Sequence, residues 1–298
     1  MEIDRKALKQ RARETMRLTN PSFRLVTLVY LLMTTGVSVT LSRIAIWTGS
    51  ETVSIFFNLL YLLYSTVAQF GFCLWALWTY QQLDPGLGAL TQGFSVTGRV
   101  ILMNLSIALR TVGWYFCGAL MMLLPAVLLM VILPLPLIGV LWLLFVLGLL
   151  GLLYAIGLRY SLAPFLLADH PDDGSEAAVR RSVTLMQGWR WEMFRLDLTF
   201  VGWIVLVLAI QFGIDVLFLV QSGFLETVRQ TLAQVNVTSE VIWALQAEGE
   251  AILSQPLPTL LTRLLPLPIT LWYVPYRSVS YAGFYDARTH LQQSTSLL

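Results

Sequence analysis

The sequence predicts an all-α fold: a polytopic bundle of about six membrane-spanning helices, with amphipathic helices at the membrane interface. Hydrophobic residues make up 57% of the 298 residues, and charged residues only 12%. A soluble domain carries about 25% charged residues, so this chain has too few charges to cover a water-facing surface. The mean hydropathy of +0.71 and several apolar runs of about 20 residues, the length that crosses a bilayer, indicate the same class.

Residues 1–24 are predicted to form a basic amphipathic segment ahead of the first span. Apolar and small side chains recur there at helical spacing, with Lys and Arg on the remaining face: Ile3, Ala7, Leu8, Ala12, Thr15 and Leu18. Such a helix suits an anionic inner leaflet, where its basic face meets lipid headgroups. The charged stretch is too long for a cleaved signal peptide, so the first apolar run is expected to remain as a membrane helix.

Residues 25–167 are predicted to hold the first four spans. The turn residues Asp84-Pro85-Gly86 separate the second span from the third. The apolar run at 100–133 is too long for one untilted span, so its first part is expected to lie at the interface. The Pro134-Leu135-Pro136 break then precedes the fourth span. The four spans are expected at 25–47, 53–80, 111–133 and 137–167.

Residues 168–195 are predicted to be a cytoplasmic linker with a short helix. Asp173 and Glu176 resemble a capping box, in which each side chain satisfies a backbone donor at a helix start. Gly188 is the expected end of this helix. A cluster of aromatic and basic residues follows, of the kind that lies at headgroup level: Trp189, Arg190, Trp191, Phe194 and Arg195.

The rest of the chain is predicted to complete a single membrane domain. The exterior segment combines apolar side chains at helical spacing with mainly acidic charges, which predicts one or two amphipathic helices. Pro266 and Pro268 fall inside the last apolar stretch, so the sixth span is expected to be kinked or broken. Within the domain 1–298, these segments are a fifth span at 196–220, the exterior segment at 221–256, a sixth span at 257–284 and a tail at 285–298.

The distribution of Lys and Arg predicts that both termini are cytoplasmic, in a protein that crosses the cell membrane several times. Basic residues crowd before the first span, beside the loop after the second, in the linker and near the C-terminus. The opposite side holds only Arg43, Arg229 and Arg263. The net charge of +2 argues against nucleic acid as a partner. The expected partner is anionic lipid of the inner leaflet, with another membrane protein as the alternative.

The sequence contains no recognisable catalytic or cofactor motif. There is no HExxH, no phosphate-binding loop and no GxSxG. His170 and His290 fall in predicted cytoplasmic segments, and Asp169–Asp173 reads as a polar loop with a helix cap rather than a metal site. Cys73 and Cys117 lie in apolar stretches and are expected to pack as small apolar residues. We therefore expect no cofactor, no metal and no enzymatic activity.

Ionisable residues inside membrane helices often mark functional sites. Gln211 and Asp215 are one helical turn apart in the fifth span, and Arg43 lies toward the same outer side in the first. One hypothesis is a polar cluster of these three residues in the outer leaflet. The alternative is that Arg43 and Asp215 each extend separately to the outer interface.

The order of motifs resembles a bacterial family of uncharacterised multipass membrane proteins, catalogued as domain of unknown function 975. The resemblance is strongest in Ser182-x-x-Leu185-Met186-x-Gly188, continues through Phe194 to Gly202-Trp203, and closes with Pro275-Tyr276 and Tyr281-Ala282-x-Phe284-Tyr285. The fold is also similar to the membrane region of some glycerophosphodiester phosphodiesterases. The resemblance implies a membrane location and a helical fold, and it implies no established activity.

The motifs suggest a platform on the cytoplasmic face that packs helices together and contacts lipid. The linker, the end of the sixth span and the N-terminal helix are expected to build it. Its candidate residues are Ser182, Met186, Gly188, Trp189, Arg190, Trp191, Arg195, Trp203, Pro275, Tyr276, Tyr281 and Tyr285. The function expected is non-enzymatic engagement of lipid, in envelope maintenance or in handling a lipid-linked substrate. The alternatives are a small-molecule transporter or permease and an accessory scaffold subunit of a membrane complex.

Overall fold

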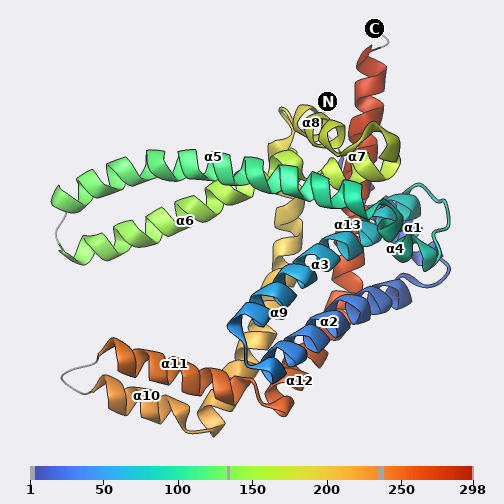
Figure 1. The fold of residues 1–298 in the computed structure, drawn as a ribbon. Coiled ribbons are helices and arrows are strands. Elements are labelled where there is room, and N and C mark those ends of the chain that lie inside the picture. The colour runs from blue at the N-terminus through green and yellow to red at the C-terminus, as the bar shows by residue number, and fades with distance from the viewer. Residues whose placement is uncertain (1–3, 133–134, 234–237, 297–298) are drawn as a thin grey trace. The chain divides into compact units, whose positions relative to one another are not determined.

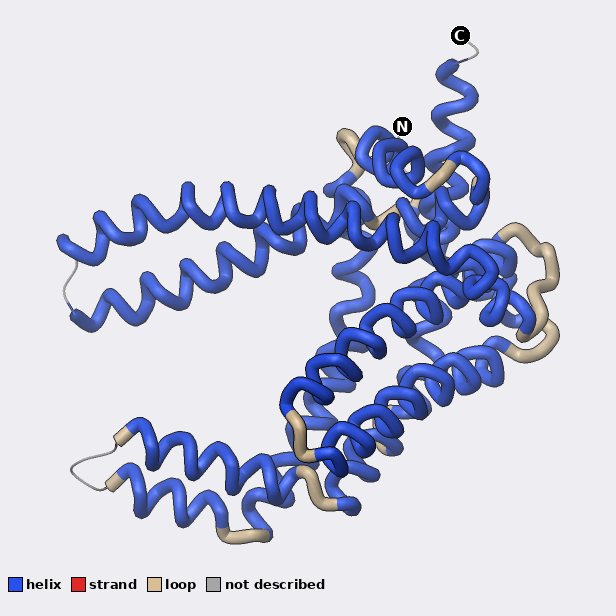
Figure 2. Tube along the Cα trace, viewed as in Figure 1, coloured by secondary structure: helices blue, strands red, loops and turns tan. Residues whose placement is uncertain are grey.

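The computed structural model describes residues 4–132, 135–233 and 238–296, and 89% of these described residues are helical. No strand occurs in those described ranges. Short loops join the helices (Figure 2). The chain divides into two compact units, one of Met1–Leu196 with Pro275–Leu298 and the other of Asp197–Val274. The all-α helical prediction is therefore confirmed, and the two units are described separately below.

The first unit contains most of the helices (Figure 1). The start of α9 (Arg190–Gln221) and the C-terminal part of α13 (Leu267–Ser296) also belong to it. Its other elements are α1 (Arg5–Leu18), α2 (Phe23–Thr48), α3 (Glu51–Tyr80), α4 (Gly88–Gln92), η1 (Gly93–Val96), α5 (Thr97–Ile132), α6 (Leu135–Tyr160), α7 (Ala163–Asp169), η2 (Pro171–Asp173) and α8 (Ser175–Leu185).

The second unit contains the rest of α9, the start of α13 and three helices between them. These are α10 (Phe224–Leu232), α11 (Ser239–Leu253) and α12 (Pro256–Leu264). The amphipathic helices expected in the exterior segment are thus present as α10 and α11. They pack through Gly249, where an added Cβ would lie 3.2 Å from the Phe224 ring.

Two helical hairpins dominate the first unit. Helix α2 runs beside α3, and α5 runs beside α6 (Figure 1). Gly49 ends α2 with φ of 62°, a left-handed conformation that glycine adopts at little cost. Gly118 and Gly148 let α5 and α6 approach closely, since they face the side chains of Leu152 and Met122. Each hairpin therefore depends on small residues at its turn or its contact face.

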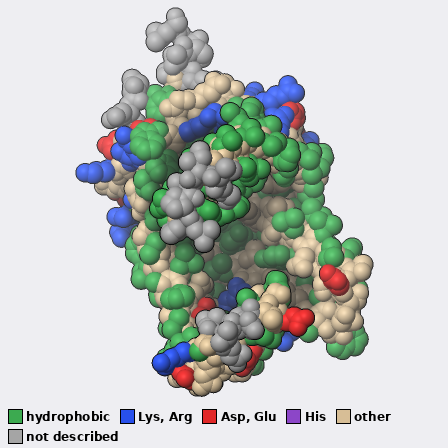
Figure 3. All heavy atoms as spheres, turned by 90° about the vertical axis from the view of Figure 1, so that its left-hand side faces the viewer, with side chains coloured by type: hydrophobic (Ala, Val, Ile, Leu, Met, Phe, Trp, Pro, Cys, Tyr) green, Lys and Arg blue, Asp and Glu red, His purple; other side chains and the backbone are tan. Residues whose placement is uncertain are grey.

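Within the described residues, five helical stretches are long and apolar enough to cross a membrane. Helices α12 and α13 would add a sixth if they form one span, and they are bent by 45° at a short break. The break predicted around Pro266 is thus present. Large hydrophobic side chains are exposed along these stretches, and Figure 3 shows them spread widely over one face. Lipid is the solvent that suits such a surface.

One local prediction is wrong, and another cannot be judged. The predicted span at 137–167 agrees with the candidate span Leu137–Asp169, within which a short break separates α6, which ends at Tyr160, from α7, which begins at Ala163. The capping box is absent, because Gly174, with φ of 85°, occupies the N-cap of α8 and no side chain caps it. The carboxylates of Asp173 and Glu176 bind arginines instead. The Pro134 turn lies outside the described residues.

The core of the first unit lies where α3, α7, α8 and α13 meet. Its largest fully buried side chains include Trp75, Leu162, Met186 and Phe284. Next to it, α4 and η1 press against α3 at glycines. A Cβ on Gly71 would overlap the Leu90 carbonyl, and one on Gly93 would lie 2.9 Å from the Gly71 Cα. This backbone contact fixes the loop between α3 and α5.

Candidate functional site

Helix α1 packs against the rest of the first unit through both its apolar and its basic side chains. Asp4 caps it by accepting hydrogen bonds from the backbone N–H groups of Lys6 and Ala7 at 2.9 and 3.2 Å. Its apolar face is buried at Leu8, Ala12 and Met16. This packing places the basic face of α1 beside the aromatic residues of α3 and α13.

The basic residues of α1 bind aromatic rings. The Arg11 guanidinium lies 4.7 Å from the ring centre of Tyr80, and that of Arg13 lies 5.0 Å from the ring centre of Tyr276. Lys9 lies over the same Tyr276 ring at 5.9 Å. Burial lowers the pKa of Lys9, and the nearby charge of Arg13 lowers it further. Part of the positive charge of α1 is therefore used to hold the helix in place.

Arg288 connects α13 to the end of α8. Its Nε and Nη2 donate to the Leu185 carbonyl at 3.2 and 3.0 Å. Its guanidinium also lies 4.4 Å from the ring centre of Trp189. Helix ends leave carbonyl groups without intrahelical partners, so Arg288 satisfies one of them and positions Trp189.

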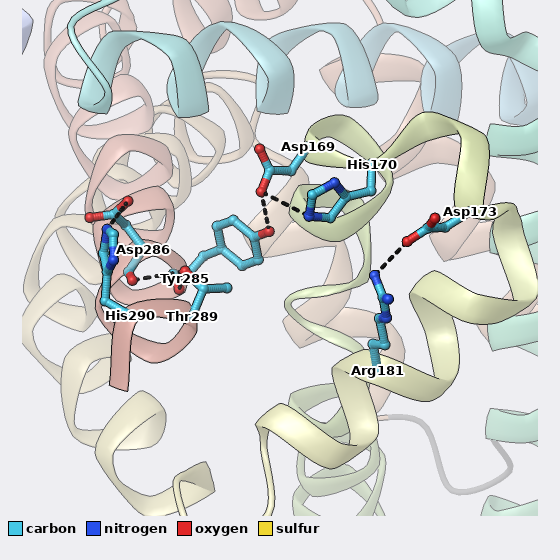
Figure 4. Close-up of polar contacts among 8 residues, drawn as sticks. All are labelled: Asp169, His170, Asp173, Arg181, Tyr285, Asp286, Thr289 and His290. Carbon is cyan, nitrogen blue, oxygen red and sulfur yellow. Dashed lines mark hydrogen bonds and ion pairs between the residues drawn. The ribbon is translucent and has the colours of Figure 1, made fainter. Parts of the chain in front are cut away.

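A polar cavity of about 570 Å³ lies between α7, α8 and α13. Tyr285 donates to Asp169 Oδ2 at 2.8 Å, and His170 Nε2 lies 3.6 Å from the same oxygen. On the α13 side, His290 Nε2 lies 3.5 Å from Asp286. Figure 4 shows these pairs together with Asp173 and Arg181. No set of three or more His, Cys, Asp or Glu residues suited to a metal ion occurs in the part of the chain that the structure describes.

Glu176 joins α8 to α5 through several donors. Arg110 Nη2 and Ser106 Oγ, both on α5, donate to its carboxylate, the hydroxyl at 3.0 Å. Arg180 Nε donates from the next turn of α8 at 2.9 Å. The Ser175 hydroxyl adds a hydrogen bond to the Arg99 carbonyl at 2.7 Å. The sequence analysis had instead assigned Glu176 to a helix cap.

Glu176→Gln is expected to destabilise the first unit by about 1 kcal/mol at neutral pH. The hydrogen bond from Arg180 holds the pKa of Glu176 below its ordinary value of 4.5, and Ser106 and Arg110 act in the same direction. A carboxyl whose pKa is lowered by folding contributes stability above its ordinary pKa, and this is lost as the pH falls through the lowered value. The difference in melting temperature between wild type and variant should therefore shrink at acidic pH.

Glu240→Gln is the matched control for this pH dependence, since Glu240 is exposed near the start of α11. Its melting curve should follow that of the wild type across the pH range. A Glu176→Gln deficit that stays constant down to strongly acidic pH would contradict the interpretation.

The aromatic and basic residues that follow α8 surround the start of α9. Trp191 is exposed and stacks on Phe194 at 5.0 Å, and Phe194 contacts Tyr154 of α6 at 6.0 Å. Arg195 lies 5.3 Å from the Trp191 ring centre and pairs with Glu192 at 3.2 Å. The start of α9 thus presents aromatic rings beside an arginine that already has a carboxylate.

Arg190 differs from its neighbours. Its Nε is buried and has no hydrogen-bond partner among the described residues. Helix α6 contacts the start of α9 through the rings of Tyr154 and Phe194, whose centres lie 6.0 Å apart, and the charge of Arg159 at the end of α6 opposes that of Arg190. Arg159 in turn lies 5.0 Å from the ring centre of Trp114 on α5. The sequence analysis did not single out Arg159 as a site residue, although an arginine at the end of an apolar span was a usable signal.

The candidate platform residues fall into three groups. Ser182, Met186, Pro275, Tyr276 and Tyr285 are buried inside the first unit. The Ser182 hydroxyl donates to the Arg159 carbonyl at 3.0 Å, which ties α8 to α6. Gly188, Trp189, Arg190, Trp191, Arg195 and Tyr281 are partly or largely exposed.

Trp203 stands apart from the other platform residues, because it belongs to the second unit and packs on Trp272 at 5.1 Å. The outer polar cluster stays a prediction. Arg43 belongs to the first unit, whereas Gln211 and Asp215 belong to the second.

A family model described as "Protein of unknown function (DUF975)" matches residues 1–238. The matched stretch includes the Ser182 motif and Gly202-Trp203, and it ends before the Pro275-Tyr276 motif. No curated protein matches the chain, and no solved structure matches it. The expected similarity to the membrane region of glycerophosphodiester phosphodiesterases stays a prediction.

Proposed function

Because this chain belongs to the DUF975 family of proteins of unknown function, we propose its role from its architecture: a non-enzymatic multipass membrane protein that binds anionic lipid. In the cell this activity would serve envelope maintenance or the handling of a lipid-linked substrate. The observation that carries the proposal is the aromatic and basic face at the start of α9, which combines exposed Trp191 with Arg190 and Arg195. Aromatic and basic side chains at the end of a span are suited to lipid headgroups.

The proposed location is the cell membrane, with both termini in the cytoplasm. The uneven distribution of Lys and Arg supports this orientation. Helix α1 adds further positive charge at the same side, since Arg5 pairs with Glu192 at the start of α9 at 3.8 Å. An anionic inner leaflet attracts such a surface by about 1 kcal/mol for each basic residue close to it.

The polar cavity between α7, α8 and α13 supports a binding protein rather than an enzyme. The carboxylate of Asp169 on α7 contacts Tyr285 of α13 and the adjacent His170. The carboxylate of Asp286 contacts His290 on the same helix. This mutual pairing suits the fixing of helices against one another. Loss of these contacts would separate α7 from α13.

Native mass spectrometry of the gently extracted full-length protein tests the proposal. We expect an anionic or glycosylated lipid to be retained in stoichiometric amount, and to be lost when Arg190 and Arg195 are both replaced by Gln. A protein that carries no lipid would contradict the proposal, and one that carries a defined protein partner would favour a scaffold role.

A transporter is the second candidate, and the break between α12 and α13 favours it. The two helices pass as a candidate span only as a pair and are bent by 45°. Broken helices line substrate sites in some transporters. Uptake of a small molecule into proteoliposomes that is abolished by changes around Pro266 would favour this candidate over lipid binding.

A further inference from the structure

Two arginines of the first unit come together without a counter-ion. Arg159 is near the end of α6, and Arg190 is the first residue of α9. Their charges repel each other, and the other ionisable group that acts on Arg190 is Tyr160. Neither arginine has a carboxylate within ion-pair distance among the described residues. The pair is therefore a local concentration of positive charge with no anion from this part of the chain.

The neighbouring arginines behave differently. Arg180 pairs with Glu176 at 2.9 Å, and Arg195 pairs with Glu192 at 3.2 Å. A charged group that loses its contact with water without gaining a partner costs free energy. The buried Nε of Arg190 has lost water and, in the described chain, has gained no acceptor. An external anion beside the two guanidinium groups would offset the repulsion between them.

The pair is held in place by the surrounding helices. The Ser182 hydroxyl fixes the backbone of Arg159 through its carbonyl at 3.0 Å. The Trp114 ring supports the guanidinium of Arg159. Arg190 is set by the turn at Gly188, whose φ is 75°. Because these contacts already order the two arginines, binding of a ligand would cost little further conformational entropy.

The position of the pair identifies the source of the anion. Residues Leu137–Asp169 and Arg190–Gln221 are consecutive candidate spans, with no further candidate between them in the described ranges. Arg159 and Arg190 therefore lie at the same side of the membrane. The exposed Trp114 ring lies against Arg159. Exposed Trp191 follows Arg190 in the chain, and α6 carries further exposed apolar side chains. Because apolar side chains are exposed next to the two arginines, an anion that also has an apolar part, as a lipid does, suits this place.

The geometry points to a binding site for the phosphate group of a membrane lipid, formed by the guanidinium groups of Arg159 and Arg190. Guanidinium groups bind phosphate through paired, charge-assisted hydrogen bonds. The site rests on the proposed lipid-binding function and names its ligand class: a lipid whose phosphate carries an exposed negative charge, such as phosphatidate, in preference to phosphatidylcholine.

Titration of the delipidated full-length protein with phosphatidate, followed by native mass spectrometry, tests this site. Arg159→Gln and Arg190→Gln are each expected to weaken binding about tenfold or more. Arg180→Gln is the matched control, since Arg180 already has Glu176 as its partner. It should leave phosphatidate binding within about twofold of the wild type.

A second measurement separates loss of the site from loss of the fold. In lipid-free detergent, Arg159→Gln is expected to raise the melting temperature, because it removes one of two repelling charges. Phosphatidate should raise the melting temperature of the wild type and not that of this variant. A variant that had merely lost its fold would melt earlier without lipid, and that result would overturn the interpretation.

The remaining outcomes are distinct. Equal losses in Arg180→Gln and Arg190→Gln would overturn the site and leave general lipid binding standing. Inorganic phosphate that binds as tightly as phosphatidate would overturn the lipid as the source of the anion. A wild-type protein that retains no anionic lipid would overturn both the site and the proposed function.

Discussion

Gly71→Val is expected to lower the free energy of unfolding by about 3 kcal/mol or more. At this position of α3, an added Cβ overlaps the carbonyl of Leu90 in α4. Gly93 of η1 closes the contact from the other side, within 2.9 Å of the Gly71 Cα for an added Cβ. Side chains can rotate away from an overlap, whereas backbone atoms on both sides cannot, so the loop must leave its place. The measurement is thermal or denaturant unfolding of the detergent-solubilised protein.

Gly36→Val is the control for this substitution. Gly36 also lies within a long helix, and an added Cβ there meets nothing within 4 Å. The control carries the same change in helix propensity, so the difference between the two variants isolates the overlap with Leu90. Similar stability of the two variants would show that α4 does not sit against α3 as described.

Phe284→Ala has the second of the two largest expected effects, a loss of about 3–5 kcal/mol. The Phe284 side chain is fully buried, with a relative exposure of 0%. Its neighbours in α13 pack in the same core: Gly283 faces the ring of Tyr80, and Tyr285 stacks on Phe165 at 5.9 Å. Removing the ring would leave a cavity that this packing cannot close. The free energy of unfolding is again the quantity to measure.

Phe116→Ala provides the matched comparison, because the Phe116 side chain on α5 is 65% exposed. The same change of residue should alter stability there by no more than about 0.5 kcal/mol. If Phe284→Ala changed the free energy of unfolding as little as Phe116→Ala, Phe284 of the Tyr281-Ala282-x-Phe284-Tyr285 motif would not stabilise the fold by packing.

The candidate site shows what a single sequence can and cannot predict. The aromatic and basic cluster around Trp191 was identifiable because aromatic and basic residues stand together at the end of an apolar run. The role of Tyr285 was not, because its hydrogen bond to Asp169 joins residues 116 positions apart. Arg159 was not singled out for the same reason: the residues near it in the chain do not show that the fold brings it to Arg190.

The sequence by itself determined that this protein is a bundle of long apolar helices, because the transfer of a helix into lipid depends on the length and composition of one continuous stretch. It also determined the amphipathic character of α1, α10 and α11, which is a matter of local spacing. Only the tertiary structure decided the partners of the charges. Glu176 pairs with Arg110 instead of capping a helix, and Arg159 acts on Arg190 with no carboxylate paired to either among the described residues. A charged side chain can pair with any opposite charge, so the choice depends on which helix faces meet, and that is a property of the packed chain.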